Sequence, residues 1–391
     1  MTAHSFPANP PSTMPSPVNI LHLHSSFSLG GKEARAVRLM NAFGDRARHT
    51  IVSGVPDQLG ARDSIAAGIA HEIAQNPPPL TGRPSVARYE AIARYMRRFD
   101  LVLTYNWGAI DGVMAKRVFP KGMPPVVHHE DGFNADEASG LKIERNIYRR
   151  FALPAAHALV VPSETLEKIA LGTWKQPPAR VHRIVNGIAT AAYAAKPDPK
   201  AIPGFRRRPG EVVIGALAGL RDVKDLPTLV RAAGGVSARI RLVIVGEGPE
   251  RERILDTAEA MDMVDRVHLP GFLPDPWRYI GLFDILALSS KSEQFPISVV
   301  EGMAAGLPIV APNVGDIAEM VSEANKSYIV SSNEVMLRDA LQVVAGAKPE
   351  ARAWLGAQNR ARAVAEYDES VMIDRYIALY EGAMGRPGAL R

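Results

Sequence analysis

Short apolar runs alternate with longer segments of helical periodicity along almost the whole chain. In the first half, the runs that we expect to form buried strands are Val18–Leu23, His49–Ser53, Leu101–Thr104, Pro125–His129 and Ala158–Val161. In the second half they are Val212–Ala216, Arg241–Val245, Arg266–Leu269, Ile285–Leu288 and Pro308–Ala311. Strands that alternate with helices in this way form parallel sheets covered by helices. The pattern therefore predicts an α/β protein.

The segment between the two halves interrupts this pattern. It contains Pro197, Pro199, Pro203 and Pro209, and proline cannot continue a central strand or a helix interior. A chain of 391 residues is also long for a single core. We therefore expect a first domain at 18–190, a linker at 191–210 and a second domain at 211–367. A last helix of roughly Glu369–Met384, within 368–391, should pack one apolar face.

Composition excludes several kinds of chemistry. The chain has no cysteine, so disulfides, thiolate zinc sites and cysteine nucleophiles are excluded. No apolar run approaches the roughly 18–20 residues that span a bilayer. Residues 1–17 are rich in Pro, Ser and Thr and lack the basic and apolar regions of a signal peptide, so we expect a disordered tail. These features predict a cytoplasmic protein.

Charge is divided unevenly between the two halves. Residues 1–190 carry 22 Lys or Arg and 15 Asp or Glu, whereas the remainder carries 24 and 26. A basic first half suggests an anionic partner, either a phosphorylated lipid or a membrane surface, although it can equally be an ordinary solvated surface. Two basic stretches have an apolar face at helical spacing, Tyr89–Phe99 and Leu141–Leu153. They could lie on the inner face of a membrane, or their apolar faces could pack on the first sheet.

The residues from Asp284 to Glu319 carry the most specific pattern. A predicted strand ends near Ser289, Pro296 stands where the first residue of a helix is expected, and Gly306 marks the end of that helix. Glu301 lies on the otherwise apolar helix, where an ionised carboxylate is costly unless it is hydrogen-bonded. Its partner could be a bound ligand or the backbone.

Glu293 and Glu301 form a Glu-x7-Glu pattern that is followed by Gly-Met-Ala-Ala-Gly and Val-Gly-Asp-Ile-Ala-Glu. This order resembles the signature of the retaining GT4 glycosyltransferase family, which has the GT-B fold of two Rossmann-like parallel-sheet domains facing across a cleft. Further matching segments cover nearly the whole chain after residue 17, namely 30–33, 128–133, 161–163, 185–187, 219–224 and 246–249. The resemblance implies a hexosyltransferase with a nucleotide-sugar donor, and a last helix that crosses back to the first domain.

The resemblance also implies donor-binding roles for residues of both halves. Glu301 would accept hydrogen bonds from the ribose hydroxyls, and the backbone N–H groups of Gln294 and Phe295 would assist at the transferred sugar. Arg221 and Lys224 would neutralise the diphosphate. Gly30 and Gly31 would let the backbone approach that diphosphate, although a Gly-Gly pair can also be a simple tight turn.

Three further residues are implied at the reacting centre. Glu293 would contact hydroxyls of the transferred sugar. A histidine would lie near the sugar and the acceptor, with His128 preferred over His129, although a histidine in a strand can equally be a packed spectator. Asp131 would orient the acceptor hydroxyl or cap a loop.

The sequence departs from the family pattern at three positions. Gly219 stands where arginine is common, Gln294 where glycine is usual, and Ala189 where an aspartate often follows Asn-Gly. The first departure affects the phosphate site, and the second affects the geometry around the donor sugar. Arg221 could substitute for the missing arginine from the next turn of the loop.

The sequence contains no Asp-x-Asp motif suited to a nucleotide-bound cation and no His/Asp cluster with ligand spacing. We therefore expect neither a metal nor another cofactor. The expected partners are a nucleotide-sugar donor and a lipid-linked or glycan acceptor in cell-envelope polysaccharide, lipopolysaccharide or glycolipid synthesis, with no nucleic acid. The alternatives are a nucleotide-sugar epimerase on the same fold and a non-catalytic sugar-nucleotide-binding protein. A dinucleotide oxidoreductase is disfavoured because no Gly-x-Gly-x-x-Gly joins the first strand to its helix.

Overall fold

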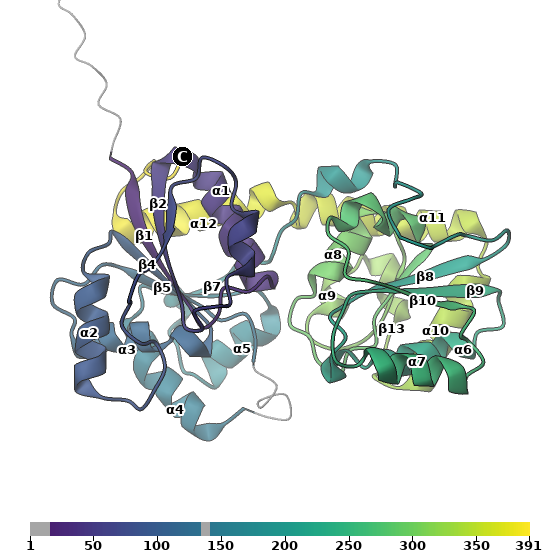
Figure 1. The fold of residues 1–391 in the computed structure, drawn as a ribbon, viewed down its shortest axis with the longest axis horizontal. Coiled ribbons are helices and arrows are strands. Elements are labelled where there is room, and N and C mark those ends of the chain that lie inside the picture. The colour runs from purple at the N-terminus through teal and green to yellow at the C-terminus, as the bar shows by residue number, and fades with distance from the viewer. Residues whose placement is uncertain (1–15, 134–140) are drawn as a thin grey trace, which may run out of the picture.

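The computed structural model describes residues 16–133 and 141–391, so most of the expected N-terminal tail lies outside the described residues. The chain forms two parallel sheets, each covered by helices on both faces (Figure 1). All the paired strands run parallel. No helix in the described part of the chain is both long enough and apolar enough to cross a membrane.

The first sheet has the strand order β3-β2-β1-β4-β5-β6-β7. Its strands are β1 Val18–His24, β2 Ala47–Ser53, β3 His71–Ile73, β4 Leu101–Tyr105, β5 Val126–His129, β6 Ala158–Val161 and β7 Val181–Arg183. The helices that follow these strands are α1 Gly31–Phe43, α2 Val86–Met96, α3 Asp111–Val118, α4 Ile143–Ala152 and α5 Glu164–Gly172. The order reverses between β1 and β4, and open parallel sheets bind ligands at the carboxyl ends of strands flanking such a reversal.

The second sheet has the order β10-β9-β8-β11-β12-β13, with the reversal between β8 and β11. Its strands are β8 Val212–Leu217, β9 Ile240–Val245, β10 Val267–Gly271, β11 Ile285–Ala287, β12 Ile309–Pro312 and β13 Ile329–Val330. Its helices are α6 Leu226–Gly234, α7 Arg251–Ala260, α8 Ile297–Ala304, α9 Ile317–Met320, α10 Glu334–Gly346 and α11 Pro349–Glu366. The loops are fitted closely: a Cβ on Gly246, whose φ is +149°, would lie 1.9 Å from the carbonyl oxygen of Ala218.

The sequence pattern locates ten of these strands and misses β3, β7 and β13. Two of the missed strands, His-Glu-Ile and Val-His-Arg, contain polar residues and are incompletely buried, and β13 has only two residues. All three lie at sheet edges, where one side of the strand need not be apolar. Apolar periodicity therefore finds the buried strands and overlooks these edges.

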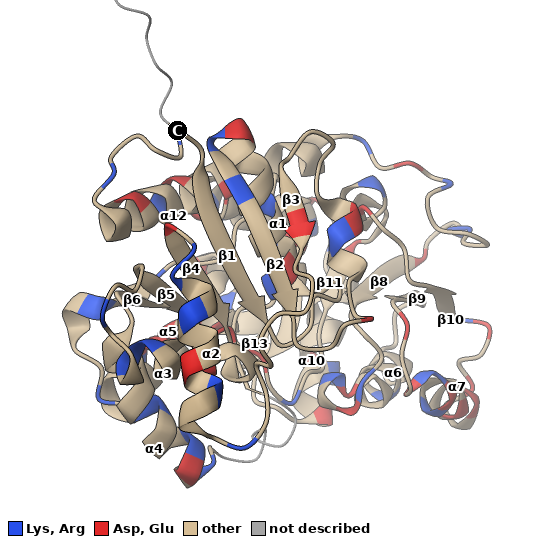
Figure 2. Ribbon diagram, turned by 60° about the vertical axis from the view of Figure 1, so that its left-hand side comes forward, with Lys and Arg blue, Asp and Glu red and all other residues tan. Residues whose placement is uncertain are grey.

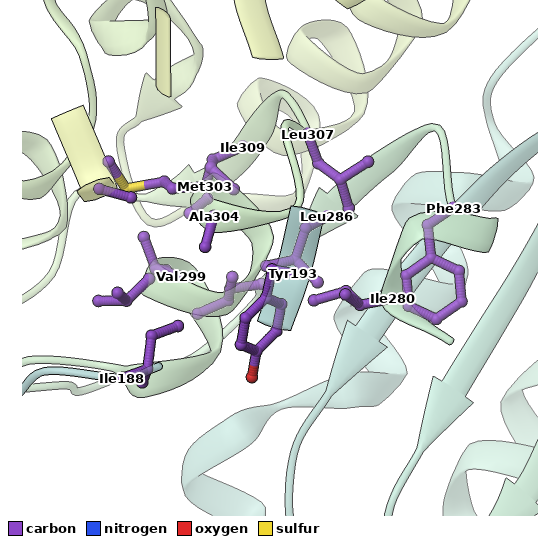
Figure 3. Close-up of a cluster of buried hydrophobic side chains, with 14 of the residues drawn as sticks. Ile188, Tyr193, Ile280, Phe283, Leu286, Val299, Met303, Ala304, Leu307 and Ile309 are labelled. Carbon is purple, nitrogen blue, oxygen red and sulfur yellow. The ribbon is translucent and has the colours of Figure 1, made fainter. Parts of the chain in front are cut away.

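The linker packs as part of the second domain's core. Tyr193 of the linker, with Ile188 just before it, lies in one buried cluster with Val299 and Met303 of α8 and Leu286 of β11 (Figure 3). Further along, Ile202 and Phe205 join the same cluster. The connection is therefore not a free tether, because its apolar side chains fix it to the sheet that carries the Glu-x7-Glu segment.

Helix α12, Glu369–Met384, returns from the second domain and covers the first sheet (Figure 1). Its Tyr376 and Tyr380 are buried in the same cluster as residues of β1, β2 and α1. The Tyr380 hydroxyl lies 2.8 Å from Nε2 of His129, and Ile188 forms an isolated parallel bridge with Asp368 just before the helix. This helix thus connects the two domains a second time.

The N-terminus of α5 in the first domain is capped by a residue of the second. The carboxylate of Asp316 accepts hydrogen bonds from the backbone N–H groups of Glu164 at 2.5 Å and Thr165 at 3.2 Å, and from the Thr165 hydroxyl at 2.9 Å. Asp316 is only 5% exposed. The free N–H groups and the positive end of a helix both favour a carboxylate there, so this contact is one of those that join the two domains.

Of the five buried histidines of the first sheet, four lie on the face that packs against α1 and α12. His22 Nε2 lies 3.0 Å from His49 Nδ1, and the rings of His24 and Tyr105 stack with their centroids 4.0 Å apart. His129 Nε2 contacts the hydroxyl of Tyr380. Burial lowers the pKa of His49 to about 4 and is the main cause that lowers the pKa values of His22, His24 and His129 well below 6.5. The positive charge of Arg35 also lowers the pKa values of His24 and His129. All four rings are therefore neutral in the folded protein at neutral pH.

Acid should weaken this fold over a defined pH range. Below about pH 6.5 these histidines bind protons in the unfolded chain but stay neutral in the folded protein. The free energy of unfolding should therefore fall by about 1.4 kcal/mol for each ring as the pH is lowered by one unit. For His49 the loss continues down to about pH 4. Urea unfolding at pH 7.5, 6.0 and 5.0 measures it, with a His49→Gln variant expected to show a smaller slope. Equal stability at all three values would contradict the neutral cluster.

Removing the carboxylate of Asp316 should loosen the contact between the domains. The Asp316→Ala variant loses a cap worth about 0.5–2 kcal/mol, so we expect a larger radius of gyration by small-angle X-ray scattering and a lower melting temperature. Asp256→Ala, at an exposed position on α7, is the control and should change neither. An unaltered scattering profile for Asp316→Ala would mean that other contacts hold the domains.

Candidate active site

The wall of the site in the second domain is built by the loop between β11 and α8. The strand ends at Ala287, and the helix begins at Ile297 with Pro296 as its N-cap. Pro296 is therefore the residue before the helix, one position earlier than the sequence predicts. Gly315, with φ of +58°, passes so close that a Cβ would lie 2.4 Å from the carbonyl oxygen of Glu293. This close passage fixes the backbone around Glu293.

Glu293 and Lys224 meet at the carboxyl ends of the strands that flank the reversal. Lys224 Nζ lies 2.5 Å from Glu293 Oε1, and the Ser290 hydroxyl donates to the same oxygen at 2.7 Å. Both charged side chains line a small cavity with residues of β8 and β11. They remain 26% and 10% exposed, so the pair is open to a ligand and not sealed in the core.

Glu301 has one hydrogen-bonding partner from the linker. The Tyr193 hydroxyl donates to Glu301 Oε1 at 3.1 Å. Burial is the largest influence on this carboxyl and raises its pKa to about 7, against the opposing effects of the Tyr193 hydrogen bond and of Arg38. The helix therefore carries a carboxylate that one phenol satisfies only in part.

The other predicted donor residues of the second domain occupy different positions. Arg221 is exposed and forms no ion pair with any described residue. The Phe295 ring is 7% exposed and packs edge-on against Tyr367, with the ring centroids 5.5 Å apart. The Gln294 side chain crosses to the first domain, where the Ser163 hydroxyl donates to its Oε1 at 3.3 Å. Only Arg221 of these three resembles a free phosphate-binding side chain.

Gly30 and Gly31 begin α1 at the end of the first sheet that faces the second domain. Gly30 is the N-cap of this 13-residue helix, and a Cβ on Gly31 would lie 3.4 Å from Ile297 Cδ1 of α8. The pair is thus the start of a helix that approaches the second domain, and not an isolated turn. The unpaired N–H groups of such a start favour anions.

The two histidines point to opposite faces of the first sheet, and both are buried. His128 is completely inaccessible, with Nδ1 2.7 Å from the Thr104 hydroxyl and Nε2 3.6 Å from Glu130. His129 contacts Tyr380 of α12. Neither ring reaches the surface in this arrangement, which matches the packed alternative for a strand histidine.

Asp131 is ion-paired with a residue that sequence reasoning did not single out. Arg35 of α1 makes two contacts to its carboxylate, one of them at 2.8 Å, and donates to Asn186 Oδ1 at 3.0 Å. The Asp131 carboxylate lies opposite that guanidinium, and the pair joins α1 to the loop after β5. A lone arginine in an amphipathic helix gives no signal of this role, and neither does the tyrosine of the linker that contacts Glu301.

No group of three or more His, Cys, Asp or Glu side chains in residues 16–133 and 141–391 is arranged to hold a metal ion. Lys224 lies beside Glu293, and the positive charge of Arg38 lowers the pKa of Glu301, against the larger effect of burial.

Comparisons with known proteins match both halves of the chain. The family described as Glycosyltransferase Family 4 matches residues 19–192, and Glycosyl transferases group 1 matches residues 199–361. A D-inositol 3-phosphate glycosyltransferase of Gordonia bronchialis is 24% identical over 310 residues, covering 73% of this chain and 66% of that protein. The chain spans about half the length of the first curated relatives that it matches.

Solved structures share the same arrangement of two sheets. HepE of Anabaena, in complex with UDP and glucose, has a TM-score of 0.75 at 18% identity, covering 93% of this chain and all of that one. WaaG, a glycosyltransferase involved in lipopolysaccharide biosynthesis, has a TM-score of 0.66 at 15% identity, covering 95% and 100%. At this identity the likeness concerns the GT-B fold. The two family matches together cover most of the chain, so this chain belongs to the GT4 family of glycosyltransferases.

Proposed function

We propose that this chain transfers a sugar from a UDP- or GDP-sugar to an acceptor hydroxyl, with retention of configuration at the anomeric carbon. The observation that carries the proposal is the meeting of Lys224 with Glu293 at the β8/β11 reversal. Glu301 lies in α8, the helix that follows Glu293, and Gly31 of the first domain lies close to the start of that helix. Cation, carboxylates and helix N-terminus match the phosphates, hydroxyls and leaving group of such a donor.

The donor would lie along the second domain's wall. Glu301 accepts hydrogen bonds from the ribose hydroxyls, and Glu293 with the backbone of Gln294 and Phe295 holds the hydroxyls of the sugar. Lys224 leaves Glu293 for the diphosphate, joined by Arg221 and by the N–H groups that begin α1 at Gly30 and Gly31.

In the proposed reaction the bond between the anomeric carbon and the phosphate oxygen breaks, and the acceptor oxygen bonds to that carbon from the same face. The acceptor proton passes to the departing phosphate, whose growing charge Lys224 and Arg221 stabilise. Asp131, held by Arg35, would orient the acceptor hydroxyl. A contact between His128 and the sugar requires its ring to leave Thr104 when the substrates bind.

The acceptor is proposed to be a glycan or a lipid-linked sugar of the cell envelope, on the cytoplasmic side. WaaG, which shares the fold, is described as acting in lipopolysaccharide biosynthesis, and the basic first half of the chain suits an acceptor near anionic lipid.

Replacing Glu301 by glutamine should have opposite effects on stability and binding. At pH 8 the fold must ionise a carboxyl whose pKa burial raises from 4.5 to about 7, so the free energy of unfolding falls as pH rises through this range. Glu301→Gln removes this cost and should stabilise the ligand-free protein by about 2–3 kcal/mol. It should also weaken the binding of UDP or GDP roughly tenfold to a hundredfold, because acceptance by a carboxylate is worth about 1.5–3 kcal/mol.

Calorimetric titration of both nucleotides and urea unfolding at pH 8 measure the two effects. Tyr193→Phe keeps the carboxylate and removes its hydrogen bond, so it shows how much of either effect comes from that bond. A Glu301→Gln variant that binds nucleotide as well as the original chain would refute the ribose assignment.

Transfer should not require a divalent metal. Since Lys224, Arg221 and the start of α1 can meet the diphosphate charge, excess EDTA should leave the initial rate of sugar transfer from the donor nearly unchanged. The assay follows nucleotide release and the acceptor product, with donor alone as the control that would expose an epimerase. A rate that collapses with EDTA and returns with magnesium would disprove metal independence.

A further inference from the structure

Two neighbouring charged residues, Lys32 and Glu33, meet at the start of α1. The Lys32 ammonium is ion-paired with Glu33 Oε1, and the two side chains are only 14% and 4% exposed. Adjacent residues of a helix point in different directions. The pair therefore forms only because both side chains bend toward the N-terminal end of the helix.

The Glu33 carboxylate lies against the first residue of its own helix. A Cβ on Gly30, the N-cap, would lie 2.9 Å from Glu33 Oε2. A glutamate three residues after the N-cap can fold back in this way. Burial raises the pKa of Glu33, against the lowering effects of Lys32 and of its own backbone N–H. The carboxylate thus occupies the place where the free N–H groups of α1 would hold another anion.

The Lys32 side chain extends toward the carboxyl end of β1 and is largely withdrawn from solvent. Burial lowers the pKa of His24, the last residue of β1, and the charge of Lys32 is the next largest cause, so the ammonium lies close to this ring. His24 is completely buried, and neither of its ring nitrogens has a hydrogen-bonding partner among residues 16–133 and 141–391. Buried polar atoms normally have such partners. The end of β1 therefore has hydrogen-bonding capacity that the described residues leave unused.

The start of α1 is directed at the wall of the second domain that carries Lys224. A Cβ on Gly31 would lie 3.4 Å from Ile297 Cδ1. Ser298, the next residue of α8, lines the same cavity as Lys224 and Glu293. Each domain thus brings one Lys–Glu pair to this part of the cleft.

The two pairs at the cleft differ from Lys–Glu pairs elsewhere in the chain. Charged residues are spread over the helices of both domains (Figure 2). The side chains of Lys168 and Glu164 are 73% and 37% exposed, and those of Lys326 and Glu323 are 38% and 87% exposed. Desolvation opposes the attraction in pairs that are withdrawn from water. Stability of the fold therefore gives no reason to enclose both pairs at the cleft.

The second domain alone provides few cations for a diphosphate. It supplies Lys224 and the exposed Arg221, but Gly219 stands where the family pattern has arginine. A cation from the opposite wall would restore the positive charge of the site. Lys32 is placed to do so, because it lies at the start of the helix that approaches this wall.

We propose that Lys32 is a further donor-binding residue that contacts the diphosphate, and that the Glu33 carboxylate takes the place of the phosphates while the site is empty. When the diphosphate binds, Glu33 leaves the N–H groups of α1, and the Lys32 ammonium passes from the carboxylate to a phosphate oxygen. The cation is then paired in both states. This assignment rests on the proposed function, because the diphosphate belongs to the donor proposed there.

Glu33 and the diphosphate compete for the same N–H groups and the same ammonium. The carboxylate therefore weakens the binding of a nucleoside diphosphate, whereas Lys32 strengthens it. A nucleoside monophosphate, which lacks the second phosphate, should be affected much less by either residue. The two side chains thus have opposite effects that depend on the number of phosphates.

Calorimetric titration of the full chain with UDP, GDP, UMP and GMP tests this assignment. Glu33→Gln keeps the shape of the side chain but removes the competing charge, so both diphosphates should bind roughly threefold to tenfold more tightly. Lys32→Met keeps the apolar stem and should bind them roughly tenfold more weakly. The exposed pair provides the matched controls, Glu323→Gln and Lys326→Met, which should bind as the original chain does.

The monophosphates are the internal reference, because a general disturbance of the fold would weaken their binding as well. If neither the original chain nor Glu33→Gln binds UDP or GDP, the proposed donor is wrong, and inorganic pyrophosphate then becomes the probe for the same variants. Equal affinity of the original chain and Glu33→Gln for the diphosphate probe would overturn the proposal. So would a crystal structure of the UDP complex in which the Glu33 carboxylate still lies against Gly30.

Discussion

All strands of a parallel sheet have their carboxyl ends on the same side, and this constraint brings the residues of the candidate site together. The loops after β8 and β11 hold Lys224 and Glu293 side by side, although 68 residues separate them in the sequence. In the first sheet the same constraint places the start of α1 and the loop after β5 at one edge, where Arg35 joins Asp131. Each sheet thus supplies half of a site, and the contacts of Asp316 and Gly31 bring the halves near one another.

Much of this architecture can be predicted from the sequence because buried strands and helices require apolar residues at regular spacing. The central strands are continuous apolar runs, and the segment from Asp284 to Glu319 alternates strand, loop, helix and strand as its residues indicate. The pairing of Lys224 with Glu293 follows from no local pattern, because each residue alone is an ordinary polar loop position. The ion pair of Arg35, the Tyr193 contact and the cap by Asp316 depend on which loops the fold brings together, so local periodicity carries no information about them.

The histidines and the amphipathic stretches show the same limit from another side. A histidine in a strand can point into a site or into a core, and the sequence alone does not show which of the two surrounds its ring. Here the His128 ring is hydrogen-bonded to Thr104, and the His129 ring to Tyr380. Likewise, α2 and α4 share composition and periodicity, but α2 buries its apolar residues Ile92 and Met96, whereas α4 buries Arg149 and leaves Ile143, Ile147 and Phe151 exposed. In both cases the decisive fact is a partner distant in sequence.

The return of α12 to the first sheet has a consequence for biosynthesis. The first sheet ends at Arg183, but the helix that covers one of its faces begins 186 residues later, at Glu369. At typical elongation rates of about 5–20 residues per second, roughly 10–40 s pass before Tyr376 and Tyr380 can reach their places. During that interval the nascent first domain leaves the ribosome with the apolar surface around His22, His49 and His129 uncovered. The order of translation therefore leaves one apolar face of this domain exposed until the second domain has been synthesised.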